Sequence, residues 1–134
     1  RKEDQSKPSL FRSSDGYLLY VGKNNQQNEI LSFQIAEGKD FWFHGKNIPG
    51  SHVIAKTEGK DLEELPDRLF EEAAELAAYF SSEGSSQKVE VDYTQKKNLK
   101  KVPGAAPGFV IYHQNYSILV SPKLKLEEIK DFPW

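Results

Sequence analysis

The sequence predicts an α+β fold, a mostly antiparallel sheet with one main alanine-rich helix packed on a face. Short β-rich runs lie on both sides of a single long amphipathic segment, so the order is strands, helix, strands. A chain of 134 residues suits one domain with a core of its own. No apolar run approaches the roughly 20 residues of a membrane-spanning helix.

Three strands are expected before the helix. Residues 16–22 form a β-rich run bounded by glycines, which is typical of a strand between turns. Residues 41–44 and 52–56 are two further strands, and the connection between them contains the turn pair Pro49-Gly50. We therefore expect these two strands to lie side by side.

The segment between the first two strands is expected to be a loop and then a short helix. Residues 23–28 are polar, and their amides suit a turn. Residues 29–36 fit both helical and strand spacing. We favour the helix, because Asn28 could cap its start and Gly38 could end it.

The long helix is predicted over residues 67–82. Pro66 suits the first turn, acidic residues gather near the N-terminal half, and Gly84 suits the stop. Leucine, phenylalanine and alanine side chains repeat along one stripe. Four of these alanines have little bulk and should let another backbone approach closely: Ala73, Ala74, Ala77 and Ala78.

The chain turns β-rich again after the helix. Residues 88–93 alternate cleanly, and residues 99–102 suit a short strand that ends at a proline. Residues 109–113 and 116–120 flank Gln114-Asn115, which is the spacing of a hairpin. We expect those last two runs to pair with each other.

Composition narrows the function classes. The chain has no cysteine, which excludes disulfides and thiolate metal sites, and no methionine, as expected of a piece of a longer protein. We expect residues 1–14 to be a linker after an upstream coiled coil, residues 15–122 to be the domain, and residues 123–134 to be a C-terminal tail.

Charge is small overall and uneven along the chain. The formal net charge is −2, which argues against a generic polyanion binder. Residues 57–84 hold nine acidic and two basic side chains, net −7, whereas residues 85–125 hold seven lysines and two acidic side chains, net +5. The second segment is either a solvated surface or an edge that contacts phosphates.

The tract 40–53 carries the candidate chemistry. His44 and His52 lie on neighbouring expected strands and could face each other. With Asp40 as a third ligand they match no standard zinc motif, so no metal or other cofactor is expected. Ser51 beside His52 would point to the opposite face, which disfavours a nucleophilic triad. Trp42 could be core or a stacking surface, and the asparagine-rich run before it could serve turns or read base edges.

Ordered blocks of the sequence resemble the NFACT-R domain. This domain is the C-terminal domain of bacterial proteins of the fibronectin-binding protein A and ribosome quality-control type. The blocks span roughly residues 15–120 and read GKNNQQN (22–28), DFWFH (40–44), PGSHV (49–53), VDY (91–93) and KKVPGAAPGFVIY (100–112). Ala106 stands where the family usually has lysine before the final Pro-Gly.

The resemblance implies a non-catalytic RNA-binding module of a ribosome-associated quality-control factor. Its implied partners are tRNA and the large ribosomal subunit on obstructed ribosomes, and its implied place is the cytoplasm. Relatives are also described as fibronectin-binding adhesins at the cell surface that lack signal peptides, so a protein-binding module is the alternative. A third hypothesis is an enzyme that uses His44 or His52 as acid or base on RNA.

The expected RNA contacts combine amides, the aromatic tract and the lysines. We expect no catalytic residue and no membrane insertion. The candidate RNA-binding residues are Asn24, Asn25, Gln27, Asn28, Trp42, His44, Lys46, Ser51, His52, Lys96, Lys97, Lys100 and Lys101.

Overall fold

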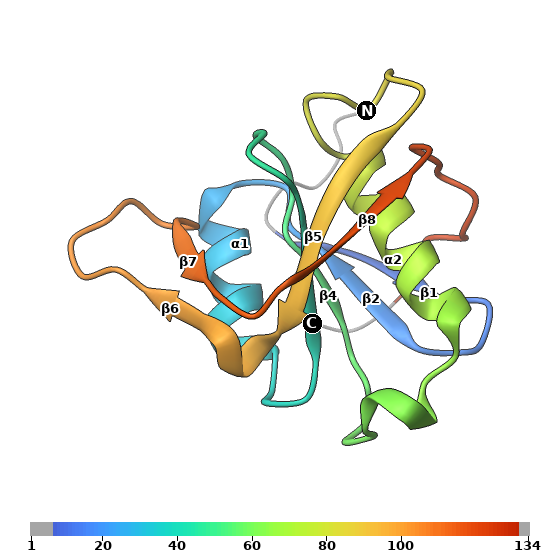
Figure 1. Cartoon of the computed structure of the whole chain (residues 1–134), viewed down its shortest axis with the longest axis horizontal. Coiled ribbons are helices and arrows are strands. Elements are labelled where there is room, and N and C mark those ends of the chain that lie inside the picture. The colour runs from blue at the N-terminus through green and yellow to red at the C-terminus, as the bar shows by residue number, and fades with distance from the viewer. Residues whose placement is uncertain (1–6, 132–134) are drawn as a thin grey trace.

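The computed structural model describes residues 7–131 and contains a six-stranded antiparallel sheet (Figure 1). The strand order is β1-β2-β4-β3-β5-β8, and every neighbouring pair is antiparallel. The strands are β1 (Ser9–Arg12), β2 (Leu18–Val21), β3 (Phe41–Gly45), β4 (Val53–Ala55), β5 (Val89–Gln95) and β8 (Tyr116–Val120). A separate pair joins β6 (Leu99–Lys101) to β7 (Val110–Tyr112). This architecture confirms the α+β prediction.

The alternation of side chains along β3 divides the core into two clusters. Phe41 and Phe43 belong to the larger cluster, under α2 (Asp67–Tyr79), whereas Trp42 points to the opposite face. There it packs with Leu31 from the π-helical turn η1 (Leu31–Ile35) and with Leu99 from β6. The sheet is therefore covered on both faces. Trp42 of the tract 40–53 is buried on the face opposite to α2.

Helix α2 packs on the sheet as expected, and it is shorter than predicted. Ala73, Ala74, Ala77 and Ala78 are all fully buried, which lets the helix backbone lie close to the strands. The helix ends at Tyr79 rather than at residue 82, because the chain turns at Phe80 and the carbonyl of Ser81 accepts the N–H of Gly84. No helix among residues 7–131 is long and apolar enough to cross a membrane.

The expected loop at residues 23–28 is wrong, because α1 (Asn25–Ile30) begins inside it. Asn24, not Asn28, is the N-cap, and its side chain accepts the N–H of Gln27 at 2.9 Å. The helix expected at residues 29–36 exists as the end of α1 and a π-helical turn, η1 (Leu31–Ile35). The chain leaves helical geometry at Ala36, before Gly38.

The expected hairpin of residues 109–113 with residues 116–120 is also wrong. β7 pairs with β6, and β8 pairs with β5. The Gln114-Asn115 turn carries the chain from the small sheet to the large one. Figure 1 shows the β6–β7 pair beside α1, with its connecting loop projecting from the body of the domain.

The terminal segments join the fold where they are described. Residues 9–12 were expected in a linker and form β1, which pairs with β2. Within the expected tail, the N–H of Ile129 donates to the carbonyl of Leu10 at 2.7 Å, so this part of the tail lies beside that strand. The linker prediction for residues 1–6 and the tail prediction for residues 132–134 lie outside the described residues.

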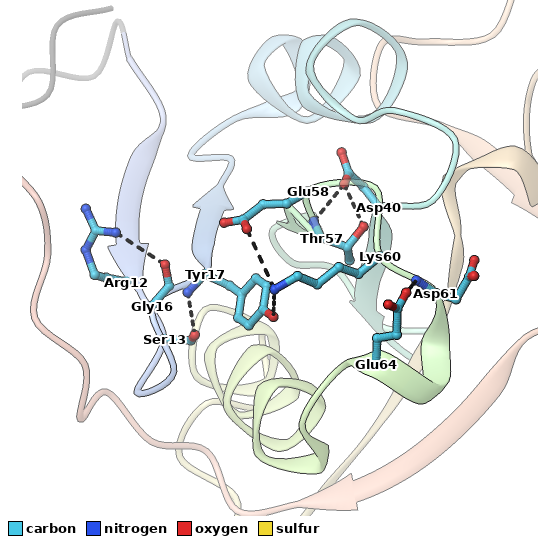
Figure 2. Close-up of polar contacts among 10 residues, drawn as sticks. All are labelled: Arg12, Ser13, Gly16, Tyr17, Asp40, Thr57, Glu58, Lys60, Asp61 and Glu64. Carbon is cyan, nitrogen blue, oxygen red and sulfur yellow. Dashed lines mark hydrogen bonds and ion pairs between the residues drawn. The ribbon is translucent and has the colours of Figure 1, made fainter.

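Polar contacts fix the acidic segment between β4 and α2 (Figure 2). Lys60 donates to the hydroxyl of Tyr17 at 2.8 Å and so ties the segment to the β1–β2 turn. Asp40 accepts the N–H of Thr57 at 2.8 Å and pairs with Lys56 at 2.6 Å. Asp40 is thus a structural carboxylate with partners of its own, not a side chain turned toward His44.

Candidate functional site

A pocket of about 330 Å³ opens between β3, the connection that follows it, and the end of the β6–β7 loop. Its walls are aromatic or apolar, with imidazole and amide groups among them. The lining residues are Trp42, His44, Asn47, Ile48, Pro49, His52, Gly108, Phe109, Val110 and Tyr112. We call this the histidine pocket. It contains three of the candidate residues: Trp42, His44 and His52.

His52 is buried and connects two other segments of the chain through hydrogen bonds. Its Nδ1 lies 2.7 Å from the hydroxyl of Ser32, and the ring also hydrogen-bonds the backbone of Gly108. The hydrogen bond to Gly108 raises the pKa of His52, so the ring is the donor in that bond. Its Nδ1 then accepts the hydroxyl proton of Ser32. These roles correspond to the neutral Nε2–H tautomer of the imidazole. Burial and the neighbouring His44 outweigh that bond and lower the pKa of His52 to about 3.

His44 faces His52, as expected from the adjacent strands. The two ring centres are 5.2 Å apart at 81°, and the His44 ring stacks on Trp42 at 5.8 Å and 12°. Burial lowers the pKa of His44 despite hydrogen bonds to the backbone of Gly45 and Gly50. Because His52 is neutral at pH 7, it does not titrate near neutrality as the acid–base hypothesis requires.

Trp42 is a core residue. Its side chain is 1% exposed and contacts the rings of His44, His52 and Tyr112, the last at 4.7 Å. Of the two interpretations left open by the sequence, the core is the one that the structure shows. Trp42 therefore cannot present a stacking face to a ligand, and its place among the candidate RNA-contacting residues is corrected. The side chain lines the wall of the histidine pocket. Its buried indole N–H has no hydrogen-bond acceptor among residues 7–131.

Three of the four candidate amides hold the backbone that surrounds the pocket. Asn24 caps α1, and the Oε1 of Gln27 accepts the N–H of Lys23 at 2.8 Å. The Oδ1 of Asn28 accepts the N–H of His52 at 3.1 Å, and its Nδ2 donates to the carbonyl of Gly50 at 3.5 Å. The fourth, Asn25, lies exposed on the first turn of α1.

Two glycines make this arrangement possible. A Cβ at Gly22 would lie 2.0 Å from the Oδ1 of Asn28, so only glycine leaves room for that side chain. Gly108 has a φ of 86°, and a Cβ there would lie 3.1 Å from the carbonyl oxygen of Asn25. Its N–H donates to the carboxylate of Glu29 at 2.9 Å. Gly108 therefore docks the β6–β7 loop on α1 and closes the pocket.

The candidate lysines fall into two groups. Lys46 pairs with Asp92 at 2.8 Å, and Lys101 pairs with Glu29. Burial alone would raise the pKa of Asp92, but Lys46 and the hydroxyls of Ser117 and Tyr112 lower it, so Asp92 is ionised. The second group follows the end of β5, with Lys96 half-buried and both Lys97 and Lys100 exposed.

The structure brings together only part of the predicted site. Asn28, His44 and His52 meet around the pocket, and Ser51 lies half-buried next to His52 and outside the lining. Lys101 reaches the same region through Glu29. Lys97 lines a different pocket, at the other end of β3. The predicted residues therefore do not form one continuous patch.

Sequence reasoning missed Phe109 and Tyr112. Phe109 is 53% exposed at the mouth of the histidine pocket, and Tyr112 donates to the Oδ2 of Asp92 at 2.6 Å. The available signal was an aromatic residue directly after the turn pair Pro107-Gly108, at the start of the strand expected over residues 109–113. An exposed phenylalanine at such a loop end is a better candidate for ligand contact than the buried Trp42.

Together, the fold and the pocket define a small α+β binding domain whose site is built from neutral, hydrogen-bonding and aromatic groups. Residues 7–114 match the family model described as the NFACT protein RNA binding domain. The chain belongs to this family, as the resemblance indicated.

Several known proteins are similar to the chain. The Rqc2 homolog RqcH of Bacillus subtilis is 41% identical over 124 residues, which are 91% of this chain and 21% of that protein. The Rqc2 homolog RqcH of Streptococcus suis is 43% identical over 119 residues, 88% of this chain and 21% of that protein. The chain thus spans about a fifth of the length of these relatives.

A solved structure agrees with the fold. It is the C-terminal part of the fibronectin/fibrinogen-binding protein from Streptococcus suis, with a TM-score of 0.82 and 40% sequence identity. The match covers 92% of this chain and 49% of the solved one.

Proposed function

We propose that this domain binds RNA, without catalysis of its own, as part of a ribosome-associated quality-control factor that acts in the cytoplasm. Its ligand would be tRNA or rRNA of an obstructed large subunit. The family description and the relatives named Rqc2 homolog RqcH support this proposal. Single-stranded or looped RNA suits the site best, because unstacked bases can enter pockets that a duplex cannot reach.

The histidine pocket is the observation that carries the proposal. Its volume of about 330 Å³ lies in the range of small-ligand sites and accommodates one base. Phe109 offers an exposed ring at the mouth, and His44 and Asn47 offer polar groups beside it. A base could stack on the phenylalanine while its edge meets these groups. The buried Trp42 and His52 would hold the walls in place.

The exposed lysines would supply the electrostatic attraction. Lys97 and Lys100 are exposed, whereas Lys46 and Lys101 are held by carboxylates. A lysine that is already paired displaces fewer counterions from a nucleic acid than an unpaired one. We therefore expect Lys97 and Lys100 to contribute more to RNA affinity than Lys46 and Lys101.

Replacing both Lys97 and Lys100 by glutamate should weaken binding to tRNA or to large-subunit rRNA and flatten its dependence on salt. Each phosphate contact on a single strand contributes about 0.7 to the slope of log affinity against log salt concentration, so losing two should reduce the slope by about 1.4. Fluorescence anisotropy over a range of about 50 to 200 mM salt measures the slope.

The matched control for that experiment is the double variant Lys88→Glu and Lys7→Glu. Both lysines are exposed, and Lys88 directly precedes β5, at the end opposite to Lys97. The control carries the same charge change away from the proposed contact. Equal slopes in the two double variants would show that the lysines after β5 have no special part in RNA binding.

Phe109→Ala should weaken RNA binding by about 1 to 3 kcal/mol, which is the usual contribution of one base stacked on an aromatic ring. Ile111→Ala is the control, because Ile111 is 48% exposed on the same hairpin and does not line the pocket. Isothermal titration with a tRNA fragment measures both affinities. If the two variants lose the same small amount of affinity, the histidine pocket is not the stacking site.

The alternative function is protein binding, with fibronectin as the candidate partner. The similar protein from Streptococcus suis is named a fibronectin/fibrinogen-binding protein. In the present chain, β8 is the last strand of the sheet, with Tyr116 and Leu119 exposed. A partner strand could add to this edge through main-chain hydrogen bonds. Such binding would survive the salt range that weakens RNA binding, so the same titration with fibronectin separates the two functions.

A further inference from the structure

A second pocket, of about 480 Å³, lies where the end of β5 meets the turn before β8. Four of its lining side chains are amides: Gln95, Asn98, Gln114 and Asn115. The other lining residues are Phe41, Leu62, Thr94, Lys97 and Tyr116. We call this the amide pocket. It shares no lining residue with the histidine pocket.

The base of the amide pocket is held by a chain of hydrogen bonds. The Nδ2 of Asn98 donates to the hydroxyl of Thr94 at 2.9 Å. That hydroxyl lies 3.2 Å from the carbonyl of Gln114, to which it donates. These bonds join the 3₁₀ turn η3 (Lys96–Asn98) to the turn before β8. The pocket is therefore formed by the fold itself and not by one mobile side chain.

The backbone of Gln114 supports a role for this turn beyond connection. Gln114 has a φ of 51°, in the left-handed region that non-glycine residues seldom adopt. The side chain that this conformation positions is exposed and lines the pocket. Such backbone strain is often found where a side chain is held for a ligand.

The pocket also has an aromatic wall. The ring of Tyr116 stacks on Tyr93 at 5.4 Å and 29°, and Tyr93 stacks on the buried Phe43 at 5.1 Å and 16°. Tyr116 ends this row at the surface and is 53% exposed. A ring held on one side and exposed on the other is suited to stacking with a planar ligand.

The charges around the amide pocket favour an anionic ligand. Lys97 is exposed in its lining, and no lining residue is acidic. On one side lies an acidic surface that includes Glu63, Asp67 and Glu71 and meets the pocket at Leu62. A polyanion would be repelled from that side and attracted toward Lys97 and Lys100.

We propose that the amide pocket binds one nucleotide of single-stranded RNA. The base stacks on Tyr116, the amides of Gln114, Asn115 and Gln95 hydrogen-bond its edge, and Lys97 contacts its phosphate. The strand continues from the pocket toward β6, away from the acidic side. This inference rests on the proposed RNA binding and adds a second contact point to it. Amides and an aromatic face are the groups with which proteins read unstacked bases.

The test uses the 134-residue chain and single-stranded RNA octamers of one base each, followed by fluorescence anisotropy. Tyr116→Ala should weaken binding of the preferred octamer about 5- to 150-fold, the equivalent of one lost stack. Leu119→Ala is its control, since Leu119 is 63% exposed on the same strand and lies outside the pocket. Leu119→Ala should change the affinity less than twofold.

A second variant guards against loss of folding in Tyr116→Ala. Gln114→Glu keeps the size of an exposed side chain and places a negative charge in the pocket, so it should weaken binding at least fivefold. Gln87→Glu makes the same charge change at an exposed position outside the pocket and should leave affinity within twofold. Thermal melting confirms that each variant is folded.

The outcomes separate this inference from the proposed function. If wild-type chain binds octamers and Phe109→Ala weakens that binding, but Tyr116→Ala and Gln114→Glu match their controls, the amide pocket is not a nucleotide site. If the wild-type chain binds no RNA at all, the proposed function itself fails. Weakening by both amide-pocket variants, with binding intact in both controls, supports the assignment.

Discussion

Trp42→Ala is expected to lower the free energy of unfolding by about 3 to 5 kcal/mol, as is usual for a large aromatic side chain removed from a core. Trp42 is 1% exposed at the centre of the sheet and is packed against Leu31, Leu99 and Tyr112 from the layer that covers it. Its loss leaves a cavity beneath both η1 and β6. Equilibrium urea denaturation measures the change.

Trp42→Phe is the matched control for that prediction. It keeps an aromatic ring in the core and removes an indole N–H that has no acceptor among the described residues. We expect it to cost clearly less stability than the alanine variant. If Trp42→Ala unfolds at the same urea concentration as the wild type, the second layer does not depend on this side chain and the assignment of Trp42 to the core is wrong.

The domain is expected to lose about 2 kcal/mol of stability between about pH 7.5 and pH 5 through His52 alone. Burial and His44 lower the folded-state pKa of His52 to about 3, whereas the unfolded chain takes up the proton near its ordinary pKa of 6.5. Within this window the unfolded state binds more protons, so stability falls as pH falls. His44, whose pKa is also lowered, acts in the same direction.

Urea denaturation of wild type and His52→Gln at about pH 7.5, 6 and 5 measures this effect. The free energy of unfolding of the glutamine variant should depend less steeply on pH than that of the wild type. The difference in slope should reach up to about 1.4 kcal/mol per pH unit, the value for one proton. His113→Gln, at an exposed position in the turn before β8, is the control for loss of one imidazole. Asp92 does not interfere, because its lowered pKa leaves it ionised at these pH values. An unchanged slope in His52→Gln would contradict a buried, neutral His52.

Local patterns predicted those elements whose contacts are mainly periodic. Helix α2 follows from the stripe of leucines and alanines between residues 67 and 79, and β5 follows from the alternation that begins at Val89. The facing of His44 and His52 was also predicted, since it needs only two adjacent antiparallel strands. The ordered blocks led to the family, which the match over residues 7–114 confirms.

Long-range contacts decided the elements that the patterns predicted wrongly. Gln114-Asn115 suits a hairpin turn, but β7 pairs with β6 and β8 pairs with β5. Local turn chemistry does not show these long-range pairings. The run at residues 23–28 looks like a loop because its amides are polar. It folds into α1 because Asn28 finds buried partners in the segment around His52.

Periodicity and ordered local motifs were enough to predict the fold class, the main helix, most strands and the family. The three-dimensional packing was needed to show that Trp42 and His52 are buried and support the histidine pocket, and that Phe109 is exposed at its mouth. It also decided that the end of β5 and the turn before β8 form a pocket. The physical reason is that burial and pocket formation arise from residues far apart in the chain, whose packing local patterns do not encode.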